Sequence, residues 1–315
     1  CYADGRKIKH PRAANFVWKC KNGKYLYWFH NQGGEIIKED VEIAYAHRNP
    51  AWLCGGVEVD TPSGKDIKWS QPEILLYDDD PLIRMSYPDL IEHQDKYLIT
   101  ETQKHHAHIH EIDSKLIDGL WNQFENSSIS KDSMIISYEE LIPSQITFPK
   151  LKPFCTYNRK MPDYRRMNLN SGFTIELAFT LSHKNKSEYF IDTRNAEGKG
   201  FSLTLHYNRA TFTLSDGRTE NSWSSDPETL STIGENHLVV IVDDGPSIIS
   251  FVINGQFNDG GVYRQFGFGR FSPHIMDINA LPIMHITQNI KLQSFRLSDR
   301  ALRVSEAIGT FQAQP

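Results

Sequence analysis

The sequence lacks the features that mark membrane proteins and nucleic-acid-binding proteins. No apolar run in it approaches the roughly 20 residues that a membrane-spanning helix needs. It has 34 Lys and Arg against 39 Asp and Glu, a formal net charge of −5, so no excess of positive charge attracts nucleic acid or an anionic membrane. We therefore expect no nucleic-acid partner and no membrane span.

Cysteine is scarce as well. Cys1, Cys20, Cys54 and Cys155 lie far apart in the chain, and no two have the close spacing of a zinc knuckle or a redox motif. We interpret them as buried apolar side chains, although an extracellular protein could join two of them in a disulfide. The amino terminus has neither an apolar signal core nor an initiator Met, which leads us to expect part of a longer protein.

What the sequence does contain is the alternation of apolar and polar residues that is typical of β-strands. Residues 16–29 hold two aromatic-rich runs on either side of Asn22-Gly23, and Asn-Gly in that position is a strong hairpin signal. Residues 90–112 hold three more alternating runs. Meanders of this size are typical of propeller blades.

Helical patterning is sparse. Residues 114–122 fit a short helix with Ser114 as its cap, and residues 138–142 fit a further turn. Between about 115 and 165 the periodicity weakens and prolines accumulate. We interpret residues 116–165 as a connector that packs over a first domain formed by residues 1–115.

From Ser171 onward the alternation returns in seven runs separated by turn-forming residues. These runs are residues 172–181, 188–194, 200–207, 210–216, 236–244, 247–255 and 289–299. The apolar faces of seven such strands must meet those of a second sheet, which predicts a β-sandwich over residues 166–315. The expected fold class is all-β: a partial β-propeller of about two blades followed by a jelly-roll β-sandwich.

The sandwich half resembles the laminin-G/concanavalin-like domains. The resemblance rests on residues 172–176, 236–243, 251–255 and 290–302, which occur in the family's order. Such domains bind glycans, sometimes with calcium, or brace a catalytic neighbour. Trp223, Tyr263 and Arg264 are candidates for accessory glycan contacts, with the alternative that the aromatic rings close the sandwich edges. No run has the spacing of a calcium-binding loop.

Residues 1–115 resemble the last blades of a sialidase-like (BNR/Asp-box) propeller. Three motifs support the resemblance: Trp69-Ser70-Gln71-Pro72, a degenerate Asp-box turn ahead of it at residues 61–69, and the Tyr-x-Asp-Leu motif at residues 87–90. A propeller needs at least four blades to close, so the resemblance implies that upstream blades are missing from this chain. It also implies a secreted or periplasmic protein.

Sialidases are retaining glycosidases that use Tyr as the nucleophile and bind the substrate carboxylate through arginines. The resemblance implies Tyr87 and Asp89 as catalytic groups and Arg48 and Arg12 as substrate-binding groups, and Arg84 competes with Arg48 for that role. Each residue has a plainer alternative. Tyr87 could be a half-buried packing residue, Asp89 could cap a turn, and the arginines could be exposed loop charges.

A histidine-rich segment follows at residues 105–110. On a strand, His106, His108 and His110 share one face, and alternate histidines can bind zinc. The acidic residue at a matching short spacing, Glu111, points to the other face. We therefore predict packing or solvent exposure for these rings, and no metal or other cofactor.

The leading functional prediction is the carboxy-terminal part of a sialidase-like glycoside hydrolase that acts on an acidic polysaccharide or glycoconjugate, inactive as this chain alone. One alternative is a propeller-fold lyase that eliminates from a uronate with a His base. The other is a carbohydrate-binding or adhesion protein without catalysis.

Overall fold

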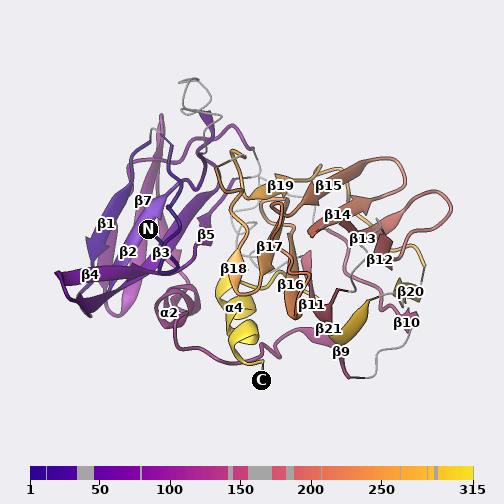
Figure 1. The fold of residues 1–315 in the computed structure, drawn as a ribbon. Coiled ribbons are helices and arrows are strands. Elements are labelled where there is room, and N and C mark those ends of the chain that lie inside the picture. Colours follow the sequence, from indigo (N-terminus) through magenta and orange to yellow (C-terminus); the bar gives the residue numbers. More distant parts are fainter. Residues whose placement is uncertain are drawn as a thin grey trace. The chain divides into compact units, whose positions relative to one another are not determined.

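The computed structural model describes residues 1–11, 13–33, 46–78, 80–140, 145–154, 172–181, 188–206, 208–262, 264–281, 283–286 and 290–314. The chain is built almost entirely from antiparallel β-sheets (Figure 1), which confirms the predicted all-β class. It divides into two compact units. The first comprises Cys1–Ile129, Gly260–Phe266 and Arg303–Pro315, and the second comprises Ser130–Asp259 and Gly267–Leu302. No helix within the described ranges is long and apolar enough to cross a membrane.

The first unit contains two sheets. The strands of its five-stranded sheet are β1 (Phe16–Lys19), β2 (Tyr25–Phe29), β3 (Ala51–Thr61), β4 (Gly64–Trp69) and β5 (Glu73–Leu76), in the order β1-β2-β3-β4 with β5 also paired to β3. The strands of its three-stranded sheet are β6 (Leu90–His93), β7 (Lys96–Gln103) and β8 (His106–Ile112), in sequence order.

Tight turns set the register of these hairpins. Gly23 has φ +83° between β1 and β2, a conformation that glycine adopts without steric cost. Lys104 and His105 join β7 to β8, so that Gln103 pairs with His106. The predicted hairpins are thus confirmed, whereas their membership of a propeller stays a prediction.

The core of the first unit lies between its two sheets and the helix α2 (Ser114–Asn122). Leu26 and Leu53 from one sheet meet Ile99 from the other, together with Leu120 of the helix. The predicted helix is confirmed, but its cap is not Ser114. Asp113 is the N-cap, and its side chain accepts a hydrogen bond from the Lys115 backbone N–H at 2.9 Å.

A second helix, α4 (Val304–Gln312), belongs to the first unit although it lies near the end of the chain (Figure 1). Its first N–H groups point to the carboxylate of Glu73 in β5. The two Oε atoms accept hydrogen bonds from the Val304 and Ser305 backbone N–H groups at 3.0 and 2.7 Å, and from Ser305 Oγ at 2.7 Å. Burial raises the pKa of Glu73, and these hydrogen bonds oppose that effect. The carboxylate thereby satisfies the unpaired donors of a helix start.

Replacement of Glu73 by Ala should destabilise the first unit, because it leaves buried helix-terminal donors without an acceptor. We expect a loss of about 2–3 kcal/mol in the free energy of unfolding, and a smaller loss for Ser305→Ala, which removes one of the three donors. Tryptophan fluorescence during chemical denaturation reports this unit, because Trp223 alone of the six tryptophans lies in the other. Equal stability of Glu73→Ala and the wild type would contradict this role.

The second unit also contains two sheets. The strands of its six-stranded sheet are β10 (Gln145–Thr147), β12 (Glu188–Asp192), β13 (Gly200–His206), β14 (Arg209–Ser215), β15 (Glu220–Ser224) and β20 (Ile283–Ile286), in the order β10-β20-β12-β13-β14-β15. The strands of its seven-stranded sheet are β9 (Met134–Glu139), β11 (Gly172–Thr180), β16 (Glu235–Asp243), β17 (Ile248–Ile253), β18 (Gln256–Phe257), β19 (Phe268–Arg270) and β21 (Lys291–Ser298), in the order β18-β17-β16-β11-β21-β9 with β19 paired to β17.

These two sheets pack face to face as the predicted sandwich. Phe173 and Ile175 of β11 meet Phe201 of β13 and Phe212 of β14 in one buried core. Each of the seven predicted runs contains a strand. The helical turn predicted at residues 138–142 is wrong where the chain is described, because Tyr138 lies in β9 and pairs with Phe295 of β21. The stretch predicted as a connector supplies α2 to the first unit and β9 and β10 to the second.

Among the described residues, Cys1, Cys20 and Cys54 are free thiols. Cys20 and Cys54 are buried, as predicted, whereas Cys1 is exposed. Burial raises the pKa of Cys20 to about 12 and that of Cys54 well above its ordinary value. Cys155 lies outside the described residues. Buried thiols with raised pKa values react slowly, because the thiolate is the nucleophile.

In a Cys155→Ser variant we expect Cys1 alone to react rapidly with a disulfide reagent such as DTNB at pH 8. Cys20 and Cys54 should react only after unfolding, since burial blocks access to both and suppresses their thiolates. Timed absorbance with and without denaturant, followed by peptide mapping, checks this. Rapid labelling of Cys54 in the native chain would contradict the burial.

Candidate functional site

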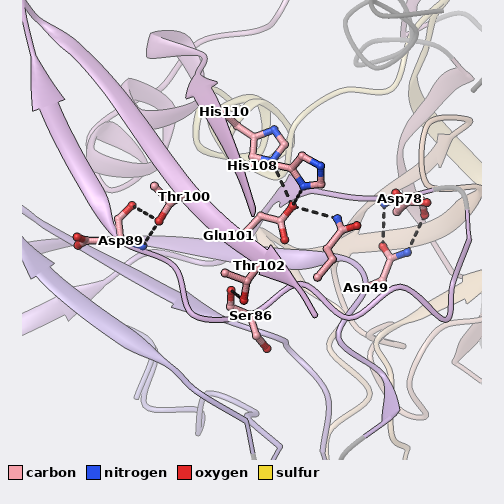
Figure 2. A network of polar contacts seen from close by, with 10 residues as sticks. Asn49, Asp78, Ser86, Asp89, Thr100, Glu101, Thr102, His108 and His110 are labelled. Atoms are coloured by element: carbon pink, nitrogen blue, oxygen red, sulfur yellow. Dashed lines mark hydrogen bonds and ion pairs between the residues drawn. The ribbon is translucent and has the colours of Figure 1, made fainter. Parts of the chain in front are cut away.

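The loop between β5 and β6 in the first unit carries Tyr87 between two anchored neighbours. Ser86 pairs with Thr102 of β7 through backbone hydrogen bonds of 3.1 and 2.8 Å, and Thr102 Oγ1 donates to the Ser86 carbonyl at 3.2 Å (Figure 2). Ser86 Oγ accepts a hydrogen bond from Arg48 Nη1 at 2.5 Å. On the other side Pro88 is buried. These contacts fix the loop on both sides of Tyr87.

Tyr87 itself is 65% exposed and has φ +51°. A bulky residue in the left-handed region is strained, and such strain persists only where the surroundings impose it. The loop therefore holds a large aromatic side chain in solvent at a conformational cost. This exposure differs from the half-buried packing position that the alternative interpretation of Tyr87 requires.

The other residues of the predicted catalytic and anion-binding set fall in different environments. Asp89 is exposed; its backbone N–H donates to Thr100 Oγ1 and its Oδ1 accepts from the Leu90 N–H, each at 2.9 Å (Figure 2). Arg48 is buried and Arg84 is exposed. Arg12 lies outside the described residues.

The segment that carries Arg48 is fixed by its neighbour Asn49. Asn49 Nδ2 donates to the carbonyls of Asp78 and Asp80 at 2.6 and 2.9 Å, and the Asp78 N–H donates to Asn49 Oδ1 at 3.2 Å (Figure 2). These bonds tie residues 48–49 to the chain that follows β5. Arg48 therefore reaches Ser86 from an anchored backbone.

A second polar cluster lies on β7 and β8, directly beside the Ser86–Thr102 pairing. Glu101 is fully buried, and its Oε1 accepts from His108 Nδ1 at 2.7 Å and from Gln103 Nε2 at 3.0 Å (Figure 2). His110 Nε2 lies 3.5 Å from the same oxygen. Burial by itself raises the pKa of Glu101, but the hydrogen bonds from His110 and His108 outweigh it and hold that pKa below its usual value.

The sequence identified the histidines of this cluster but not its carboxylate. His106, His108 and His110 share one face of β8, as predicted, with ring centroids 6.2 and 5.9 Å apart. Their acidic neighbour comes from the opposite strand, where Glu101 pairs with His108. A two-residue turn at residues 104–105 pairs residue 103 with 106 and hence 101 with 108. Assignment of this turn in the sequence would therefore have identified Glu101 as the neighbour of His108.

The predicted accessory residues do not fall in one unit. Trp223 lies in β15 of the second unit and packs on the sandwich core, and a Cβ at Gly269 of β19 would lie 2.6 Å from its ring. The indole thus fills the edge between the two sheets. Arg264 belongs to the first unit, where its carbonyl accepts from Lys9 Nζ at 2.6 Å. Tyr263 lies outside the described residues.

His30 is a buried titratable group near Arg48. Burial, together with the positive charge of Arg48, lowers the pKa of His30 from 6.5 to about 3, against a contribution from the Pro50 backbone that raises it. The folded chain therefore holds this imidazole neutral at pH values where the unfolded chain protonates it. Between pH 6.5 and 3 the unfolded chain binds the extra proton, so stability falls as the pH falls through this range.

We expect this linkage to add up to about 1.4 kcal/mol per pH unit to the loss of stability below pH 6.5. A His30→Gln variant, which cannot protonate, should show a correspondingly shallower decline in the free energy of unfolding between pH 6.5 and 4.5. Denaturant titrations across this range check the slope. His93→Gln, at an exposed position, is the control and should keep the wild-type slope; identical slopes for wild type and His30→Gln would contradict the assignment.

No family model matches the sequence, and no curated protein matches it. Among solved structures, a Ruminococcus gnavus IT-sialidase CBM40 aligns at TM-score 0.38 and 12% identity over 56% of this chain and 99% of its own. The botulinum neurotoxin serotype D binding domain aligns at 0.37 and 11% over 48% of this chain.

A leech intramolecular trans-sialidase aligns at TM-score 0.38 and 10% identity over 58% of this chain. The alignments span 38% of the neurotoxin chain and 28% of the leech chain.

Proposed function

We propose that this chain is the carboxy-terminal part of a secreted or periplasmic glycoside hydrolase that acts on an acidic polysaccharide or glycoconjugate, with Tyr87 as the nucleophile. The observation that carries the proposal is the strained, exposed conformation of Tyr87. Its neighbour Ser86 is fixed by hydrogen bonds to Arg48 and to the Thr102 backbone. Backbone strain of this kind concentrates at functional sites. The Tyr-x-Asp-Leu motif, whose first residue is Tyr87, supports the same role.

A tyrosine nucleophile suits an anionic sugar. A carboxylate nucleophile would be repelled by the substrate's own carboxylate, whereas a neutral phenol is not until its proton leaves. The guanidinium of Arg48, bonded to the residue next to Tyr87, brings positive charge to this loop, and the exposed Arg84 adds more. Positive charge here favours a bound substrate carboxylate.

Asp89 is the acidic residue that the same loop provides for proton transfer, and its orientation is set by the Leu90 N–H. Further groups for acid catalysis and substrate binding would come from outside residues 1–315. On this proposal the second unit braces the catalytic part or binds glycan as an accessory domain.

The test is Tyr87→Phe in the full-length protein, assayed for sugar release from sialylated and uronate-containing glycans. Loss of the nucleophile should lower kcat by at least about 100-fold while the glycan still binds. Tyr189→Phe, at an exposed tyrosine of the second unit, is the matched control and should retain activity. Wild-type turnover by Tyr87→Phe would refute the nucleophile.

The same assay separates the two alternatives. An unsaturated product that absorbs in the ultraviolet would show that the reaction is a β-elimination, and that the protein is a lyase and not a hydrolase. Full glycan binding without turnover by the wild type would indicate a carbohydrate-binding protein.

A further inference from the structure

We propose that Glu101, His108 and His110 form a binding site for a divalent transition-metal ion, with Zn²⁺ as the first candidate. The three side chains come from the paired strands β7 and β8 and point toward one another (Figure 2). One donor atom from each lies within 4.8 Å of the others. The site lies within the first unit and does not depend on the proposed hydrolase activity.

The spacing of the donor atoms is close to what a tetrahedral ion requires. Zn–N and Zn–O bonds of 2.0–2.2 Å place neighbouring ligand atoms roughly 3.3 Å apart. His110 Nε2 already lies 3.5 Å from Glu101 Oε1, and His108 Nδ1 lies 2.7 Å from it. An ion between them would replace the hydrogen bonds with coordinate bonds after the His108 contact lengthens by a fraction of an ångström. Side-chain rotation alone can supply such a change.

An independent observation is the second oxygen of Glu101. The three hydrogen bonds described for this carboxylate all reach Oε1, from His108, His110 and Gln103. Oε2 is buried and has no hydrogen-bond partner within the described part of the chain. A buried carboxylate oxygen without a partner is costly. Bidentate coordination of a cation, with Oε2 as a ligand atom beside Oε1, would satisfy it, while Gln103 keeps the carboxylate oriented as outer-shell partners of metal ligands do.

The donor set indicates the class of metal. Two imidazoles and one carboxylate suit Zn²⁺ and its first-row neighbours, whereas Ca²⁺ and Mg²⁺ prefer oxygen ligands throughout. Three protein ligands leave at least one coordination position open. His108 keeps 40% of its side chain exposed, so water or an anionic ligand can reach that position.

His106 provides a matched control. It lies on the same strand and face as His108, with its ring stacked at a centroid distance of 6.2 Å, but it is exposed and is not one of the three clustered donors. If metal binding required only several histidines on one face of β8, His106 would contribute as much to the affinity as His108 and His110. If the cluster is a built site, His106 is dispensable and Glu101 is not.

The experiment measures Zn²⁺ binding to the full chain by isothermal titration calorimetry, in a Cys1→Ser background that removes the exposed amino-terminal thiol. We expect one ion per chain in the wild-type site. Glu101→Gln, His108→Ala and His110→Ala should each weaken binding by at least about 10-fold, and His106→Ala should leave it unchanged. Absence of saturable binding, or equal weakening by His106→Ala, would overturn the proposal.

A second measurement needs none of the site variants. Zn²⁺ added to chain labelled with ¹⁵N-histidine should move the ring resonances of His108 and His110 in proportion to occupancy, and Co²⁺ should give the intense visible bands of a tetrahedral site. Shifts confined to other histidines would rule out the cluster. These measurements use no glycan, so an absence of Zn²⁺ binding would not contradict the hydrolase proposal. Wild-type turnover by Tyr87→Phe would likewise not contradict the metal site.

Discussion

The carboxylate of Glu73 accepts hydrogen bonds from the first residues of α4 across more than 230 positions of sequence, and the organisation of the first unit depends on this interaction. A buried anion is costly unless several donors surround it, and the start of a helix supplies them together with its dipole. The network continues from Ser305 to Gln123 at the end of α2 through a 3.2 Å hydrogen bond. One side chain of β5 thereby connects this strand with α2 and α4.

Much of this fold is encoded locally and could be predicted from short stretches of sequence. Asn22-Gly23 sets a turn within a few residues, and alternation identified β1 and β2, the strands β6 to β8 and seven strands of the sandwich. It did not identify β3 (Ala51–Thr61) of the first unit or the strand β9 of the second. The extent of α2 agrees with the prediction, and only its cap differs, because Asp113 and Ser114 are both good N-caps. Helix α4 was not predicted. Its cap residue is Arg303, which is not one of the usual N-cap types, and the acceptor for its Val304 and Ser305 N–H groups is Glu73, more than 230 positions away in sequence.

The candidate site residues also separate into those that local sequence reveals and those that depend on contacts between distant segments. The motif around Tyr87 could be recognised from neighbouring residues, but its positive φ and the Arg48–Ser86 bond depend on contacts between separate segments. The histidine face of β8 follows from period-2 geometry. Its carboxylate depends on the register of β7 against β8, which pairs Glu101 with His108. Glu111, the acidic residue adjacent to these histidines in sequence, lies on the same strand as they do but points to the other face. A cluster of side chains from two paired strands can be predicted from sequence only after the turn between the strands, and hence their register, is assigned.

The chain leaves the first unit at residue 129 and returns to it at residues 260–266 and again from residue 303. This path sets an order for folding during synthesis. Every residue of the second unit emerges from the ribosome before α4 does, so the sandwich can close while the first unit still lacks the helix that satisfies Glu73. At ordinary translation rates the interval between the synthesis of residue 129 and that of α4 lasts on the order of ten seconds. During it the nascent meanders expose an apolar face and a buried-site carboxylate without its partner, which makes this interval the period of greatest need for a chaperone.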